Sequence, residues 1–292
     1  RDEGATRGHP QRTVSSEVEI PLAGGDVTEG VVRVGDTVRR PHAPWSSSVA
    51  AYLRHLERVG FGGAPRYLGV DEQGRDMLEF VEGDVPGQPV VEPWAGTDAA
   101  LVGVARLLRR LHDASAGFAP PAGATWFGED VVVELPSDLP EEPPADVISH
   151  FDVTPQNVVF RGGEPVALID FDLTRPGARL RDVVQTAVYW VQLVPPGDRH
   201  PAFARGDVPA RLAAFVDTYG LDGDERARFC DVAIHGATRS WHKMKANAAV
   251  RGGGWARMWA DGVGDLILRR RAWLVEERPM LETALGVSAA DG

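Results

Sequence analysis

The residues from Ile148 to Phe160 contain the side chains best suited to chemistry. His150, Asp152 and Asn157 form an H-x-D-x-x-x-x-N pattern, and Asp170 follows 13 residues after the asparagine at the end of an apolar run. In phosphoryl transfer a carboxylate orients or deprotonates the acceptor hydroxyl, and Mg²⁺ bridges the phosphate oxygens. Because Mg²⁺ prefers carboxylate and amide oxygens, we predict Asp152 as the catalytic base and Asn157 and Asp170 as metal ligands.

Each of these side chains has a simpler explanation when it is considered alone, since Asp and Asn commonly cap turns and end strands. The combination favours the catalytic interpretation, because a predicted hairpin of residues 158–160 and 166–169 brings Asn157 and Asp170 together. We expect His150 to be structural. For Asp172 two roles are equally supported, as a ligand of a second metal ion or as a cap of the next segment.

Composition excludes several classes of protein. The chain has 292 residues, 43% of them hydrophobic, and a net charge of −11. This charge argues against nucleic-acid binding and mildly favours cationic small molecules, although solubility alone explains it. A single cysteine, Cys230, fits a reducing cytoplasm. Apolar runs of the roughly 20 residues needed to span a membrane are absent, so we expect a cytoplasmic protein without membrane or nucleic-acid partners.

The first third of the chain reads as a small β-rich region after a polar tail at residues 1–14. Alternating patterns predict strands, and the stretch from Pro44 to Arg58 has the periodicity of an amphipathic helix. The predicted strands are 17–22, 31–34, 37–40, 67–70 and 76–81. The turn at residues 23–28 contains Gly24 and Gly25 and suits a loop that covers phosphates. Residues 82–87 read as a linker.

The rest of the chain is predicted to be mostly helical. Thr97 should cap a helix that runs to Ala114, and residues 115–146 read as a loop-rich, solvated excursion. After the catalytic hairpin, the predicted helices cover residues 181–193, 209–219, 224–250 and 255–285. The chain is therefore expected to be α+β.

These motifs together resemble the aminoglycoside phosphotransferase family of the protein-kinase-like superfamily. That family carries a His-x-Asp loop followed by an Ile-Asp turn. The segments 107–112 (LLRRLH) and 64–69 (APRYLG) are similar to two further family motifs, and Asp182 resembles the family's structural aspartate. The similarity extends from about residue 17 to 193 and is specific at residues 148–173.

The resemblance implies a bilobal, protein-kinase-like fold. The N-lobe would span residues 15–82 and the mostly helical C-lobe residues 83–292. Glu79 and Val81 would belong to the hinge whose backbone meets the base of ATP or GTP, and Gly24 and Gly25 would cover its phosphates. Mg²⁺ would be the metal cofactor.

The N-lobe departs from this family pattern. Kinases place a lysine on the third strand, but the only lysines here are Lys243 and Lys245. We expect Arg39 or Arg40 to replace it, with a preference for Arg39. The glutamate that normally pairs with that lysine is also missing from the first turns of the following helix.

Two features of the loop favour a small acceptor over a protein. Phe151 stands where protein kinases carry the arginine that pairs with a phosphorylated activation loop. Only residues 171–177 separate the turn that contains Asp170, called the metal turn here, from the next element. This segment is too short for such a loop.

The predicted function is transfer of the γ-phosphate to a hydroxyl of an aminoglycoside-like or other amino-bearing acceptor, of the antibiotic-resistance type. A metabolite kinase for an amino alcohol or sugar, and a catalytically silent nucleotide-binding protein, remain alternatives. The protein is expected to be a monomer or homodimer. Candidate acceptor residues lie on the C-terminal helices, where tryptophans usually belong to the core and carboxylates to solvated faces. They are Trp190, Trp241, Trp255, Trp259, Asp231, Asp261 and Asp265.

Overall fold

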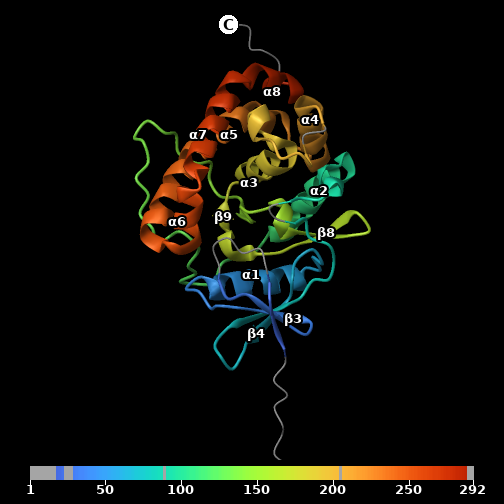
Figure 1. Cartoon of the computed structure of the whole chain (residues 1–292), viewed down its shortest axis with the longest axis vertical. Coiled ribbons are helices and arrows are strands. Elements are labelled where there is room, and N and C mark those ends of the chain that lie inside the picture. Colours follow the sequence, from blue (N-terminus) through green and yellow to red (C-terminus); the bar gives the residue numbers. More distant parts are fainter. Residues whose placement is uncertain (1–17, 23–28, 88–89, 204–205, 288–292) are drawn as a thin grey trace, which may run out of the picture.

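The computed structural model describes residues 18–22, 29–87, 90–203 and 206–287. Figure 1 shows a small region of strands and one helix, coloured blue and cyan, below a larger helical region that ends in the red C-terminal helices. The predicted bilobal α+β fold is confirmed. The Gly24–Gly25 turn and the tail at 1–14 lie outside the described residues.

The N-lobe is built on one antiparallel sheet with the strand order β1-β2-β3-β5-β4. All five predicted strands are present. They are β1 (Glu19–Pro21), β2 (Val32–Val34), β3 (Thr37–Arg40), β4 (Tyr67–Val70) and β5 (Asp76–Glu79). The register between β3 and β5 pairs Arg40 with Asp76 and Thr37 with Glu79. The third strand therefore lies in the middle of the sheet, where its side chains can reach the C-lobe.

Helix α1 (Ser46–Arg58) joins the sheet to the C-lobe. Val49, Tyr52, Leu53 and Leu56 recur at helical spacing and are all buried in the main core. The Tyr52 hydroxyl also hydrogen-bonds Ser115 in the C-lobe. Helix α1 thus holds the two lobes together through its apolar face.

The linker after the sheet is paired with the catalytic hairpin. Asp84 and Phe160 exchange two backbone hydrogen bonds of 2.8 Å. Gly83 has φ 151°, and a Cβ there would lie only 2.5 Å from the carbonyl oxygen of Phe160. A residue without a side chain is therefore required where the chain crosses between lobes.

The C-lobe contains the remaining helices and two short antiparallel ribbons. Helix α2 (Asp98–Ser115) begins as predicted at Thr97, whose hydroxyl accepts the N–H of Ala100. The ribbons pair β6 (Val147–Ser149) with β9 (Arg175–Gly177), and β7 (Val158–Arg161) with β8 (Glu164–Leu168). The second ribbon is the predicted hairpin.

Helices after the ribbons form the outer part of the C-lobe. They are α3 (Arg179–Ala187), continued by a π-helical turn at Val188–Gln192, then α4 (Val208–Tyr219), α5 (Gly223–Arg251), α6 (Gly253–Ala260), α7 (Val263–Glu276) and α8 (Arg278–Ala284). The single stretch predicted from 255 to 285 is thus three helices, and Gly262, at φ 91°, makes the first break. Within the described residues, every helix is too short or too polar to cross a membrane.

Candidate active site

The loop that carries Asp152 is anchored by a buried carboxylate on α3. Asp182 is fully buried and accepts the backbone N–H groups of His150 and Phe151, at 2.7 and 2.9 Å. Nε2 of His112, at the end of α2, donates to the same carboxylate at 3.1 Å. Burial opposes its ionisation, but the hydrogen bond and charge of His112 hold the pKa of Asp182 below its usual value. Asp182 therefore fixes the loop as a charged acceptor.

His150 is structural in this arrangement, as predicted. Its ring is buried, with Nε2 3.1 Å from the carbonyl oxygen of Ile169 and Nδ1 accepting the N–H of Asp152 at 3.3 Å. Burial lowers the pKa of His150, which favours the neutral ring. Both ring nitrogens bind backbone groups, so the residue ties the metal turn to the catalytic loop.

Asn157 is directed at the predicted base. Its side-chain nitrogen donates to the backbone oxygen of Asp152 at 3.0 Å and to Oδ2 of the same residue at 2.7 Å. The carbonyl oxygen of Val153, in the same loop, accepts Nε1–H of the buried Trp190 at 2.8 Å. Since the amide nitrogen is committed to Asp152, the amide oxygen of Asn157 is the atom that can bind a cation.

The hairpin brings Asp170 to the same place. Val158 pairs with Leu168, and the N–H of Ile169 donates to the oxygen of Asn157 at 2.9 Å. Asp170 then adopts a left-handed conformation, with φ 59°. Strain of this kind in a residue other than glycine is common at functional sites.

The donor set suits a hard divalent cation. Asp152, Asn157 and Asp170 all line one cavity, and the Asp170 side chain is one-third exposed. The described residues contain no group of three or more His, Cys, Asp or Glu placed to hold a metal alone. Mg²⁺ generally takes only one or two protein carboxylates and completes its shell with phosphate and water. The oxygen ligands from Asn157 and Asp170 fit that pattern.

The expectation that Arg39, and not Arg40, points into the cleft is wrong. Arg40 is buried and reaches the metal turn, where it pairs with Asp172 and lies 3.4 Å from Oδ1 of Asp170. Arg39 points to the other side, where it bonds Thr37 and lies 3.6 Å from Asp71. Successive strand residues face opposite sides, and the strand presents Arg40 to the catalytic residues.

Asp172 takes the place of the glutamate that was expected to pair with the cation on the third strand. The first turn of α1 carries no acidic residue, and the carboxylate that pairs with Arg40 comes from the metal turn instead. Burial disfavours the charge, but Asp172 and Asp170 outweigh it and raise the pKa of Arg40 above its ordinary value. The cation is therefore fixed by a different partner from the one expected.

The predicted hinge residues lie at the junction of the lobes. The N–H of Phe80 donates to the oxygen of Asp36 at 2.9 Å, and the Glu79 side chain accepts Nε–H of Arg66 at 3.1 Å. Glu79 and Val81 line a second cavity, behind α1, that shares no lining residue with the first. Their contact with a nucleotide base, like that of Gly24 and Gly25 with phosphates, stays a prediction.

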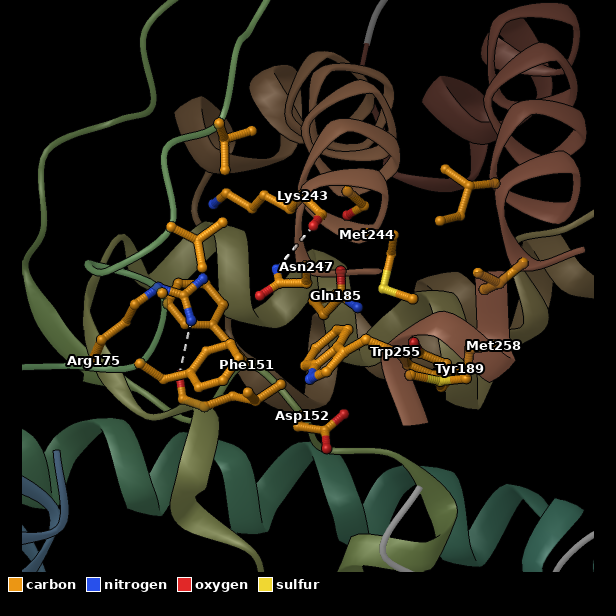
Figure 2. Close-up of a pocket in the computed structure, with 18 of the residues that line it drawn as sticks. Phe151, Asp152, Arg175, Gln185, Tyr189, Lys243, Met244, Asn247, Trp255 and Met258 are labelled. Atoms are coloured by element: carbon orange, nitrogen blue, oxygen red, sulfur yellow. Dashed lines mark hydrogen bonds between the residues drawn. The ribbon is translucent and has the colours of Figure 1, made fainter. Parts of the chain in front are cut away.

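The cavity beside Asp152 has a volume of about 450 Å³, within the range of small-molecule sites. Figure 2 shows Asp152 at its lower edge, with Tyr189 and Met258 on the right, Trp255 near the centre, Arg175 on the left and Lys243 above. Phe151 forms part of the floor, and the Arg175 guanidinium lies 4.1 Å from its ring centre.

Most of the predicted acceptor residues do not reach this cavity. Of the four tryptophans only Trp255 lines it, and none of Asp231, Asp261 and Asp265 does. Asp231 pairs with Arg278 at 2.6 Å, and Trp190 belongs to the core. The three carboxylates lie outside the cavity, which agrees with the expectation that such residues belong to solvated faces.

Sequence reasoning missed the residues that do line the cavity because they come from scattered segments. They are contributed by the loop between α2 and β6, by α3, α5, α6 and α7, and include Phe127, Gln185, Tyr189, Lys243, Met244, Met258 and Arg270. The loop was predicted to be solvated, yet its Glu142 binds Arg181 and Arg239 at 3.3 Å each. One local pattern does mark this wall, since Ser240, Lys243, Met244 and Asn247 recur at helical spacing on one face of α5.

Comparisons with known proteins identify the family. A family model described as the APH phosphotransferase enzyme family matches residues 126–230. The chain is 34% identical over 281 residues to the trifolitoxin immunity protein of Rhizobium leguminosarum bv. trifolii, covering 91% of this chain and 98% of the relative.

Solved structures share the fold at lower identity. A microcompartment-associated aminopropanol kinase matches with a TM-score of 0.61 and 15% identity, over 92% of this chain and 95% of its own. A choline/ethanolamine kinase family protein from Mesorhizobium loti matches with a TM-score of 0.58 and 16% sequence identity, over 94% of both chains. An amicoumacin kinase matches with a TM-score of 0.57 and 11% sequence identity, over 90% of this chain and 89% of its own. From the family model and the 34% identical relative, which this chain covers over 98% of its length, the chain belongs to the APH phosphotransferase family.

Proposed function

We propose that the protein is a small-molecule kinase that transfers the γ-phosphate of ATP or GTP, with Mg²⁺, to a hydroxyl group of its acceptor. The observation that carries this proposal is the meeting of Asp152, Asn157 and Asp170 at the edge of a cavity of about 450 Å³. A carboxylate base and two oxygen ligands beside a cavity of small-molecule size are what phosphoryl transfer to a small alcohol requires.

Each residue has a defined part in this reaction. Asp152 orients the acceptor hydroxyl and takes its proton, while the amide nitrogen of Asn157 holds the Asp152 carboxylate in place. When bound to Asn157 and Asp170, Mg²⁺ supplies charge neutralisation at the phosphate oxygens. Arg40, held beside Asp170 by Asp172, gives the N-lobe a cation near the phosphates.

The biological role we propose is protection against a toxic small molecule in the cytoplasm. The 34% identical relative is named an immunity protein, and phosphorylation of a hydroxyl changes the charge of a toxin that must fit its target. A metabolite kinase for an amino alcohol or sugar is the alternative; an aminopropanol kinase shares the fold. A silent nucleotide-binding protein is less well supported, because the three catalytic side chains are positioned together.

The test is a phosphotransfer screen with Mg-ATP and Mg-GTP against aminoglycosides, peptide antibiotics, amino alcohols and sugars. For an acceptor that is turned over, Asp152→Asn should lower kcat by about 10²- to 10⁴-fold. Asp138→Asn, an exposed residue of the same charge, is the matched control and should leave kcat unchanged. Full turnover by Asp152→Asn would reject the assigned base. Nucleotide binding without transfer to any acceptor would favour the silent alternative.

A further inference from the structure

We propose that the acceptor carries a carboxylate together with a large apolar body. The carboxylate binds Arg270 and the other cations that line the cavity, Arg175, Arg181 and Lys243, which we call the cationic wall. This inference rests on the proposed function, because it names the acceptor class of the same site. It differs from the amino-bearing acceptor that the family resemblance implies.

Arg270 is a buried cation for which the described residues supply no counter-ion. Its side chain lines the cavity and its residue is only 7% exposed. In the described part of the chain no hydrogen bond or ion pair reaches it, and its Nε is buried without a partner. Burial lowers the pKa of Arg270, yet a guanidinium stays charged at neutral pH. An unpaired buried charge is costly, and an anionic ligand removes that cost.

The surroundings of Arg270 add to the positive charge. Arg175, Arg181 and Lys243 also line the cavity. The carboxylate of Glu142 is shared, at 3.3 Å from Arg181 and 3.9 Å from Lys243, and it also binds Arg239. One carboxylate therefore faces several cations. Burial lowers the pKa of Arg175 to about 10, which leaves it charged at neutral pH.

Carboxylates that could bind an ammonium group are scarce here. Besides Asp152 and Asp170, Glu129 is the one acidic residue among those described that line the cavity. Its Oε2 accepts the N–H of Trp126 at 3.0 Å. A polyamine acceptor would place its cations beside the arginines, which like-charge repulsion disfavours.

The other side of the cavity is apolar and aromatic. Phe127 and Trp255 stack with ring centres 5.7 Å apart and planes 21° apart. Met244 and Met258 line the same cavity, and Figure 2 shows them on the side of Trp255. Methionine adapts to irregular apolar ligands. The cavity thus offers a cationic wall, an apolar wall and Asp152 at its edge. A hydroxyl compound with a carboxylate and a ring system, such as a short peptide with a free C-terminus, matches all three.

Two binding probes test the wall without needing turnover. Anilinonaphthalene sulfonate is aromatic and anionic, and Nile red is aromatic and neutral. Arg270→Met should weaken sulfonate dye binding about tenfold, as expected for a lost charge-assisted contact, and leave Nile red binding unchanged. Arg271→Met is the matched control, since Arg271 is the exposed neighbour on α7. Equal sulfonate binding by wild type and Arg270→Met, or none by wild type, overturns the proposal.

A phosphotransfer arm then separates this inference from the proposed function. Acetyl-seryl-tryptophan as the free acid should be phosphorylated at least tenfold more efficiently than its amide, and Arg270→Met should abolish that ratio. Preference for the amide or for aminoglycosides overturns the anionic acceptor while the kinase function stands. Arg270-dependent dye binding without phosphate transfer to any compound rejects the function and leaves the anion site intact.

Discussion

Asp182 and Arg270 are two buried charges within one lobe, and their surroundings are opposite. Asp182 accepts three hydrogen bonds, two from the backbone of the catalytic loop and one from His112. Arg270 has no hydrogen-bond or ion-pair partner in the described residues. A fully partnered buried charge fixes local structure, whereas an unpartnered one carries a cost that folding alone does not offset. Asp182 holds the loop that carries Asp152, the proposed base, and Arg270 is the proposed partner of an anionic ligand.

The largest effect expected from this contrast is on Asp182. Asp182→Asn removes the charge and turns an acceptor into a donor facing a backbone N–H, so the free energy of unfolding should fall by about 3 kcal/mol. Urea denaturation measures it. Asp113→Asn, on the exposed face of α2 where Asp113 pairs with Arg109, should change it by less than about 0.5 kcal/mol. Similar values for the two variants would remove the anchoring role.

Arg40 lies between these extremes, because its partners Asp172 and Asp170 also belong to the metal turn. Arg40→Met should raise the KM for nucleotide about tenfold, the effect of losing one charge-assisted contact. Arg39→Met removes an arginine directed at Asp71 and should leave this KM within about twofold. Steady-state kinetics with Mg-ATP measure both, and the reverse ranking would contradict the orientation of the strand.

Arg270 should behave unlike Asp182 when its charge is removed. Arg270→Met replaces an unpaired buried cation by an apolar side chain of similar length. The free energy of unfolding without ligand should therefore rise by about 1 kcal/mol. Urea denaturation at pH 7 measures it, with Arg271→Met as the neutral reference. A loss of several kcal/mol would show that Arg270 supports the fold.

The smallest effect expected is a pH dependence set by Lys243. Burial lowers the pKa of Lys243 to about 8. The attraction of Glu142 opposes this shift, and the nearby arginines add to it. The side chain is cationic below this value, so binding of the sulfonate dye should weaken about threefold as pH rises from 7 to 9. Lys243→Met should show a flat profile. A profile that stays steep in this variant would assign the titration to another group.

The same shift has a defined consequence for stability. In the unfolded chain Lys243 regains its ordinary pKa of 10.5, so between pH 8 and 10.5 the unfolded state binds more protons than the folded state. The contribution of this lysine to the free energy of unfolding therefore rises with pH across that window.

Sequence reasoning correctly placed side chains whose neighbours are close in the chain. Asp152 and Asn157 lie just before one hairpin and Asp170 just after it, and the register of this hairpin follows from its alternation and its Gly162–Gly163 turn. Their spacing along the chain therefore determines their spacing in space. Helix α1 was equally predictable, because its apolar residues recur at helical spacing.

The failures share a physical cause, which is dependence on distant segments. Whether Arg39 or Arg40 faces the cleft depends on how the sheet sits on the C-lobe, and both side chains have acidic partners far along the chain. The acceptor wall draws residues from a loop and four helices. No local pattern distinguishes the unpaired Arg270 from its neighbours Arg269 and Arg271.

The irregular loop of residues 116–146 supplies both halves of the acceptor environment. Phe127 contributes to the apolar wall, and Glu142 moderates the charge of the cationic wall. The catalytic hairpin and Asp182 lie outside this loop. The printed hydrogen bonds that hold Asp152 and Asn157 come from residues outside this loop, so a change within it leaves those contacts in place.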